Sequence, residues 1–180
     1  PGPDGALLAP LEKILRNDPD RKVIFIRLMG SKPEYALRYP PEFARFTQCS
    51  DIQAAPEFTN ENCVQLNNYD NSIVYTDAVL KDIIELTDRL APESALVYFS
   101  VHGANAYGEP YANAPQSKRK SIHFYEIPFF VWLSEGFRAA NASSAASWPQ
   151  YTARRASLND LPYTLTDLAG VTFKGYDAAR

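Results

Sequence analysis

The chain has 180 residues, of which 46% are hydrophobic and 22% charged, and its formal net charge is −3. This composition is typical of a globular protein with one core and argues against extensive disorder. Because basic residues are not in excess, nucleic acid is excluded as an expected partner. The longest uninterrupted apolar run, residues 127–133, is too short to span a bilayer.

The first half of the chain predicts a helix followed by a strand. Residues 5–17 carry leucine and isoleucine at helical spacing, with Asp4 as the expected N-cap. Residues 22–30, KVIFIRLMG, form an apolar run rich in β-branched side chains, which predicts a strand buried on both faces of a parallel sheet. A loop rich in proline and tyrosine follows at 31–46, with a short helix expected at 41–46.

The second half continues the alternation. A long helix is predicted from about residue 60 to 90, where an apolar stripe alternates steps of three and four residues. Residues 94–102 and 127–134 predict two further strands, and the long polar loop between them has a length that is usually functional. A connector of small residues is expected at 139–148, and the last helix, 157–170, is predicted to end at its glycine.

Helices that alternate with strands indicate an α/β fold, with a mostly parallel sheet and helices on both faces. In such sheets ligands gather at the carboxyl ends of the strands. Three loops are expected there: RLMGSKPEY, SVHGANAYGE and SEGFRAA. The sequence has no Walker A loop, G-x-G-x-x-G, G-x-S-x-G, zincin or C-x-x-C motif, so no short motif identifies the chemistry by itself.

Two cysteines, Cys49 and Cys63, leave two interpretations open. A disulfide between them would stabilise the fold by about 3 kcal/mol if it acts through chain entropy, and would imply an oxidising compartment. Two free thiols in a cytosolic protein are the alternative. A metal pair is not expected, because no second cysteine or histidine stands nearby. The polar flanking sequence favours the disulfide.

Five segments, in this order, carry a resemblance to a known family: LMGSKPEYALRYPPEFARF, YDNSIVYTDAVLKDII, ALVYFSVHG, YEIPFFVWLS and LPYTLTDLAG. They resemble the carboxyl-terminal half of lipopolysaccharide phosphoethanolamine transferases, members of the sulfatase and alkaline phosphatase superfamily. The YEIPFFVW segment is most similar to the heptose-modifying branch. The resemblance implies that residues 1–180 form a single α/β domain, sulfatase/alkaline-phosphatase-like, that corresponds to part of the family's catalytic domain.

The same resemblance implies a location and a chemistry. Family members are inner-membrane proteins whose periplasmic domain transfers phosphoethanolamine through a zinc-bound threonine. Zinc lowers the pKa of such a nucleophile and neutralises charge on the phosphoryl oxygens. The chain opens with PGPDG and has no signal peptide, so membrane attachment is expected through an upstream segment. The family's threonine and one glutamate ligand are expected there too.

The other two zinc ligands of the family are the aspartate and histidine of a Ser-Asp-His-Gly-Glu loop. In this chain Val101 and Ala104 replace the two acidic residues, and only His102 remains. Valine cannot ligate zinc, and one histidine alone would hold the ion weakly. We therefore expect no zinc cofactor unless the family's site is retained by other residues. An ordinary histidine, hydrogen-bonded at a strand end, is the alternative for His102.

Two further family histidines correspond to Arg27 and Lys32, which flank Ser31 in the sequence. At the carboxyl end of a strand these residues could bind phosphate or another anion without a metal. The alternative is that the two cations pair with Glu34 or another carboxylate. His123 lies closest to the family's loop histidine, and a solvent-facing position is the alternative for it.

Two charged features have simple structural alternatives. The run SKRKS, residues 117–121, is either a solvated stretch or attracts anionic headgroups by about 1 kcal/mol per cation near a membrane. Asp70 and Asp77 lie near one helix face, but paired acid/base work is not favoured. Tyr69, Asp70 and Asn71 are instead expected to anchor the long helix against neighbouring loops.

Two functions from different classes follow. The favoured one is a phosphoethanolamine transferase-like pseudoenzyme with a decayed zinc site, a binding or interaction module at the periplasmic membrane face. It would contact phosphorylated lipid or sugar headgroups. The alternative is part of an active transferase or sulfatase-like hydrolase that acts on lipopolysaccharide phosphate groups, with its nucleophile on an amino-terminal segment. No catalytic residue is assigned within the chain.

Overall fold

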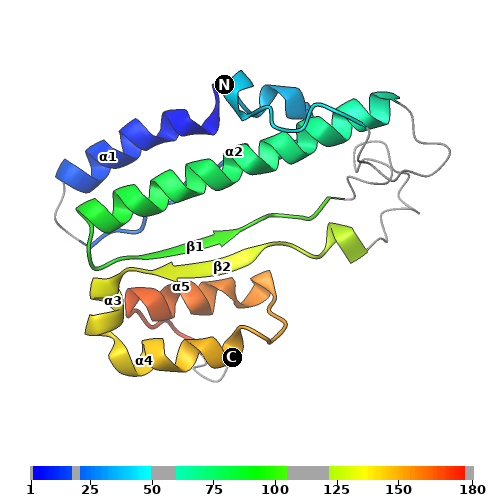
Figure 1. The fold of residues 1–180 in the computed structure, drawn as a ribbon. Helices are drawn as coiled ribbons and strands as arrows, with labels where there is room; N and C mark the ends of the chain where they lie inside the picture. The colour runs from blue at the N-terminus through cyan, green and yellow to red at the C-terminus, as the bar shows by residue number, and fades with distance from the viewer. Residues whose placement is uncertain (1, 18–20, 50–59, 105–121, 177–180) are drawn as a thin grey trace.

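The computed structural model describes residues 2–17, 21–49, 60–104 and 122–176. A two-stranded sheet lies between two helical layers, one made by α1 and α2 and the other by α3, α4 and α5 (Figure 1). The helices and strands are α1 (Leu8–Asn17), α2 (Asn60–Leu90), β1 (Ala95–Phe99), β2 (Phe129–Leu133), α3 (Glu135–Ala140), α4 (Ala142–Ser147) and α5 (Leu161–Ala169). Single 3-10 turns lie at Asp4–Leu7, Tyr35–Leu37, Pro41–Phe43, Ile122–Phe124, Trp148–Tyr151 and Leu158–Asp160.

The predicted long helix and the predicted final helix are confirmed. α2 covers the expected residues, and α5 ends at Gly170, whose φ of +64° lies in the left-handed region that favours glycine. A connector of small residues was expected at 139–148, but most of this segment is helical and belongs to α3 and α4. Alanine has the highest helix propensity, and this segment is rich in it.

The direction of the sheet differs from the prediction. β1 and β2 pair antiparallel, with Ala95 opposite Leu133 and Phe99 opposite Phe129. The expected parallel arrangement is therefore wrong for the described strands. A parallel pair requires a crossover connection, whereas an antiparallel pair needs only a chain that turns back on itself. Apolar runs predict that strands exist but do not encode their direction.

The strand expected at residues 22–30 is not formed in the described residues, where 21–29 belong to no helix or strand. The segment nevertheless has the two-faced pattern of a strand. Ile24 and Leu28 pack against the core, whereas the side chains of Val23 and Phe25 are 65% and 83% exposed. Burial of both faces was expected, whereas the structure partly buries Ile24 and Leu28 and leaves Ile26 exposed as well.

The core lies where α1 crosses α2 and the sheet. Its buried members are apolar side chains on one stripe of α2 together with one leucine of α1, namely Leu11, Tyr75, Val79, Ile83 and Leu86. Burying each large apolar side chain stabilises a fold by about 1.5–3 kcal/mol. This stripe attaches α2 to the rest of the protein along its second half.

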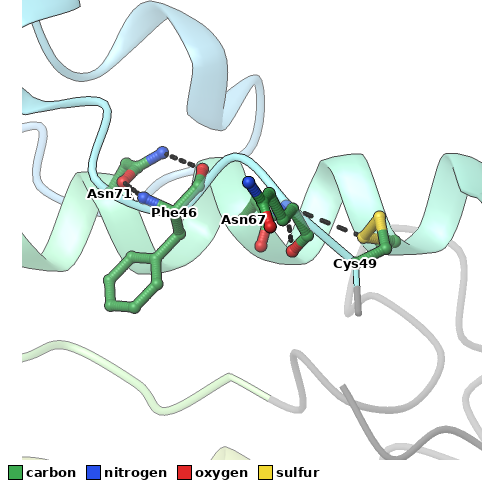
Figure 2. Close-up of a disulfide and its surroundings, with 6 residues drawn as sticks. Phe46, Cys49, Asn67 and Asn71 are labelled. Atoms are coloured by element: carbon green, nitrogen blue, oxygen red, sulfur yellow. Dashed lines mark hydrogen bonds between the residues drawn. A yellow bond between two sulfur atoms is a disulfide. The ribbon is translucent and has the colours of Figure 1, made fainter. Parts of the chain in front are cut away.

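The first half of α2 carries polar residues at buried positions instead. Asn71, 1% exposed, accepts hydrogen bonds from the backbone N–H groups of Arg45 and Phe46 through Oδ1, both at 2.8 Å. Its Nδ2 donates to the carbonyl oxygen of Phe46 at 2.9 Å (Figure 2). The Asn71 amide therefore supplies the backbone of residues 45 and 46 with hydrogen bonds that a neighbouring strand would otherwise supply. This confirms the expectation that Asn71 anchors α2 to a loop.

One turn before Asn71, a disulfide and a second amide continue the same attachment. Cys49 and Cys63 are bonded, with their Cα atoms 5.8 Å apart, which confirms the predicted disulfide. Asn67 Nδ2 donates to the carbonyl oxygen of Gln48 at 3.2 Å (Figure 2). Since Cys63, Asn67 and Asn71 are spaced by four residues, they share one face of the helix.

Asp4 is not the helix N-cap that the sequence predicts, since Pro3 occupies that position. Its buried carboxylate instead accepts hydrogen bonds from the N–H groups of Met29 at 2.9 Å and Gly30 at 2.8 Å. Gly30 has a φ of +50°, a backbone conformation that favours glycine. The carboxylate thus fixes the turn that follows the extended segment.

Replacing Asn71 with alanine is expected to lower the free energy of unfolding by about 1–3 kcal/mol, because the buried amide that holds the backbone groups of Arg45 and Phe46 would be lost. Urea unfolding measures this change. Asn68→Ala is the matched control on α2, because Asn68 is only partly buried and accepts one bond, from Tyr39 Oη at 2.7 Å. Equal losses in the two variants would contradict the anchoring role.

Candidate functional site

The loop that follows β1 holds His102 at the protein surface. Ser100 Oγ donates a hydrogen bond to the carbonyl oxygen of His102 at 2.9 Å, which fixes the turn. The ring nitrogen Nδ1 of His102 lies 2.8 Å from the carbonyl oxygen of the next residue, Gly103. The neighbouring Val101 is 82% exposed. His102 is therefore hydrogen-bonded at a strand end, which was the structural alternative for it.

Gly103 joins this loop to the turn before β2. Its N–H donates to the carbonyl oxygen of Phe124 at 3.0 Å. A Cβ atom at this position would lie 2.0 Å from the carbonyl oxygen of His123 and 2.5 Å from that of Glu126, so only glycine fits. This contact brings the backbone that carries His102 next to the backbone that carries His123. Both histidines are exposed.

These residues do not form a zinc site. Zinc in proteins takes three or four ligands from cysteine, histidine and carboxylate side chains. Across residues 2–17, 21–49, 60–104 and 122–176, no group of three or more such side chains is placed to hold a metal. In the loop itself, Val101 and Ala104 offer no donor atom, and the Nδ1 of His102 faces a backbone carbonyl. The donor set therefore does not fit zinc.

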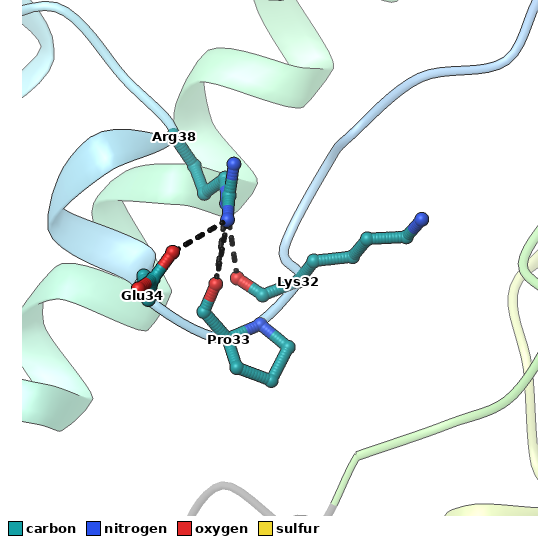
Figure 3. Close-up of polar contacts among 4 residues, drawn as sticks. All are labelled: Lys32, Pro33, Glu34 and Arg38. Atoms are coloured by element: carbon teal, nitrogen blue, oxygen red, sulfur yellow. Dashed lines mark hydrogen bonds and ion pairs between the residues drawn. The ribbon is translucent and has the colours of Figure 1, made fainter. Parts of the chain in front are cut away.

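The turn at residues 29–34 is the second candidate site, and side chains from elsewhere hold it in place. Ser31 is hydrogen-bonded to Ser72 of α2 through the two hydroxyl oxygens, 2.8 Å apart. Arg38 donates to the carbonyl oxygens of Pro33 at 2.8 Å and Lys32 at 3.3 Å (Figure 3). The turn is thereby fixed with Ser31 directed toward α2.

The acidic residue in this turn has a partner that the sequence analysis missed. Glu34 lies 3.5 Å from Arg38, measured between the carboxylate and guanidinium groups, and not against Arg27 or Lys32. The i, i+4 spacing of Glu34 and Arg38 was a signal that could have revealed this pair. The expected alternative, in which Glu34 neutralises the two candidate cations, is wrong.

Lys32 and Arg27 therefore remain candidates for anion contact. The side chain of Lys32 extends away from Glu34 and Arg38 (Figure 3), and Arg27 is exposed at the end of the extended segment. Within the described part of the chain, neither cation forms an ion pair. The SKRKS run at 117–121 lies outside the described residues.

The first strand lies close to the same turn. Burial raises the pKa of Tyr98 on β1, and the negative charge of Asp4 raises it further. The same carboxylate accepts hydrogen bonds from the N–H groups of Met29 and Gly30.

Asp70 and Asp77 of α2 are assigned no catalytic role. Burial raises the pKa of Asp70, while Asp77 is exposed. The neighbouring Tyr69 packs edge-to-face on Tyr35, with ring centroids 5.2 Å apart. A structural role for this part of α2 fits these contacts.

The third expected site loop, SEGFRAA, is helical instead: it comprises the N-cap Ser134 and all of α3. Ser134 caps this helix by accepting from the N–H of Phe137 at 3.1 Å. A cleft of about 240 Å³ lies beside it. The cleft is lined by residues of β2, the helices that follow it and the start of the adjoining turn: Leu133, Phe137, Asn141, Ser144, Ala145, Trp148, Asp167 and Leu168.

Comparison with known proteins identifies the family. The sulfatase family pattern matches residues 2–171. This chain belongs to the sulfatase family. It is 32% identical over 180 residues to phosphoethanolamine transferase EptC of Escherichia coli strain K12, covering 98% of this chain and 30% of that protein. It is 33% identical over 187 residues to phosphoethanolamine transferase EptA of the same strain, covering 98% of this chain and 33% of that protein.

Solved structures agree with the sequence comparisons. The C-terminal periplasmic domain of EptC from Escherichia coli matches with a TM-score of 0.83 and 33% identity, over 97% of this chain and 49% of that domain. The same domain in complex with zinc matches equally well. The Campylobacter jejuni domain matches with a TM-score of 0.73 and 29% identity, over 98% of this chain and 56% of that domain.

These matches confirm the resemblance to phosphoethanolamine transferases and the sulfatase-like fold of a partial domain. The chain spans about a third of the curated relatives it matches and about half of the solved domains. Among the described helices, none combines the length and the apolar character needed to cross a membrane.

Gly103→Ala is expected to lower the free energy of unfolding by about 1–3 kcal/mol, because the new Cβ would overlap backbone oxygens that cannot move independently. Urea unfolding measures the loss, and hydrogen exchange should show faster exchange around residues 100–104 and 122–126. Gly2→Ala is the control, since a Cβ at Gly2 would meet nothing within 4 Å. If Gly103→Ala behaved like Gly2→Ala, the two loops would not depend on this contact.

Proposed function

We propose that this chain is a phosphoethanolamine transferase-like domain that has lost its zinc site and acts as a binding module, not as a catalyst. The observation that carries the proposal is the donor set after β1, where Val101-His102-Gly103-Ala104 offers one histidine and no carboxylate. The similar solved structures are periplasmic domains, which supports a periplasmic location for this chain. The Cys49–Cys63 disulfide supports an oxidising compartment.

Electrostatics explains why the loss of one carboxylate matters for zinc. A carboxylate ligand contributes both a bond and a negative charge that stabilises a divalent cation, and valine contributes neither. An exposed histidine has no such charge to offer. With its Nδ1 facing the carbonyl oxygen of Gly103, His102 would have to bind zinc in competition with water. The scaffold of the loop persists, held by Gly103, without a complete set of ligands.

The proposed binding role rests on Arg27 and Lys32. These two cations have no carboxylate partner within the described residues, and the turn that carries Lys32 is fixed by Asp4 and Arg38. Phosphate monoesters on lipid or sugar headgroups are the anions that such groups would bind at a membrane face. Ser31 positions the turn through Ser72. We place this activity on residues 1–180 as a single domain.

A second function is favoured by one observation. The Escherichia coli EptC domain in complex with zinc superposes on this chain with a TM-score of 0.83. A backbone this similar would be retained if the chain were part of an active transferase or hydrolase acting on lipopolysaccharide phosphates. Its nucleophile and further zinc ligands would then lie on a segment that is not part of this sequence.

Titration of the disulfide-bonded chain with zinc chloride distinguishes the two functions. We expect calorimetry to detect no stoichiometric binding, because one exposed imidazole cannot hold the ion against water. The chelator EDTA should leave the melting temperature unchanged. One equivalent of bound zinc that is lost in His102→Ala but kept in the control His123→Ala would overturn the decayed-site proposal and support the second function.

The anion site is tested by titration with O-phosphoethanolamine and inorganic phosphate at low ionic strength. Arg27→Ala and Lys32→Ala should each raise Kd by about five-fold, corresponding to roughly 1 kcal/mol per cation. Lys81→Ala is the control, because exposed Lys81 lies 3.1 Å from Glu85 and is placed in no site. Equal Kd values in all four proteins, including the parent chain, would eliminate this site.

A further inference from the structure

The cleft beside α3 is built largely from one face of α4. Asn141, Ser144, Ala145 and Trp148 line it, and their spacing of three and four residues places them on the same side of the helix. The helix α5, in the same layer of the fold, contributes Asp167 (Figure 1). The volume of about 240 Å³ is below the roughly 300–1,000 Å³ of pockets that hold drug-sized ligands, so a ligand would be small.

The charge of the cleft has one sign. Asp167 is the single charged side chain among the described residues that line it. Its Oδ1 accepts a hydrogen bond from Tyr176 Oη, because the segment after α5 folds back and places the ring of Tyr176 edge-to-face on Phe173. A carboxylate has about four acceptor positions, so this bond orients the group and leaves capacity for a ligand.

The neutral polar side chains of the cleft add further acceptors. Asn141 Nδ2 donates to the carbonyl oxygen of Phe137 at 3.0 Å, which leaves Oδ1 as the acceptor of this amide. The hydroxyl of Ser144 can also accept a hydrogen bond. A primary ammonium group has three N–H donors and no acceptor, and therefore matches this set of oxygen atoms.

The other walls of the cleft are apolar and aromatic. The indole of Trp148 is partly buried, and Phe137, Leu133 and Leu168 complete the lining. The face of an aromatic ring attracts a cation, and tryptophan does so most strongly. An aromatic wall beside a carboxylate thus favours a cation that carries an apolar group.

We propose that this cleft binds a small organic ammonium compound, with the nitrogen at Asp167 and Trp148 and the apolar part against Leu133 and Leu168. The site is separate from the proposed anion site, since neither Arg27 nor Lys32 lines the cleft. A ligand that carries a phosphate close to its ammonium group fits less well, because the lining offers the phosphate no cation.

Heteronuclear NMR of the isotope-labelled, disulfide-bonded chain tests the proposal with 2-phenylethylamine as the probe. The indole N–H signal of Trp148 should shift saturably, with a Kd of about 1–10 mM for so small a ligand. The second indole signal, from Trp132, is the internal reference, because Trp132 does not line the cleft.

Three further compounds separate charge from apolar contact in the parent chain. The neutral analogue 2-phenylethanol and the anion 3-phenylpropionate should each bind at Trp148 at least about five-fold more weakly, because they lack the positive charge. O-phosphoethanolamine should also bind there about five-fold more weakly, since its phosphate meets Asp167 without a cation nearby.

Asp167→Asn should raise the Kd of 2-phenylethylamine about five-fold, because asparagine keeps an oxygen for Tyr176 but lacks the charge. Asp88→Asn is the matched control and should leave Kd unchanged, since Asp88 is exposed on α2 and removes the same charge outside the cleft. Arg27→Ala and Lys32→Ala should likewise have no effect on this Kd.

Three results would overturn the proposal. The first is the absence of a saturable shift at Trp148 with 2-phenylethylamine. The second is equal affinity for 2-phenylethylamine and 2-phenylethanol in the parent chain, which would show an apolar cleft without selectivity for a cation. The third is an Asp167→Asn variant that binds the amine as tightly as Asp88→Asn. None of these results bears on the phosphate titration, so the anion site stands or falls by its own test.

Discussion

The buried polar face of α2 is the constraint on which the turn at residues 29–34 and the segment up to Cys49 depend. The amide of Asn71 satisfies three backbone groups of residues 45 and 46, and the hydroxyl of Ser72 holds Ser31. Leaving a buried polar group without a partner costs more free energy than a typical hydrogen bond contributes. These contacts therefore restrict the path of the backbone. The long segment between the first turn and the disulfide is therefore ordered without a sheet of its own.

The loop that follows β1 separates residues that hold the fold from positions that could carry a ligand atom. Gly103 is required by packing, because its neighbour is the backbone of the next loop. Val101, at a position that carries a ligand in the family, has no such packing requirement, since it is 82% exposed. A donor atom can therefore be lost at the surface without loss of the fold. This separation between structural and chemical residues supports a binding role for a chain that keeps the sulfatase-like architecture.

Local patterns accounted for much of the fold. The apolar stripe of α2 predicted its whole length, because helical periodicity is carried by residues three and four apart. Gly170 marked the end of α5 for an equally local reason, its left-handed backbone conformation. The family resemblance, which the comparisons confirm, came from motifs in a fixed order.

The sequence by itself determined α1, α2, α5 and the residues available at each strand end, because these depend on short stretches of chain. Only the tertiary structure decided the direction of β1 and β2 and the role of Asp4. Each of these depends on which distant backbone or charge lies opposite. A carboxylate at the start of a helix looks like a cap until the fold brings two backbone N–H groups, twenty-five and twenty-six residues away, within its reach.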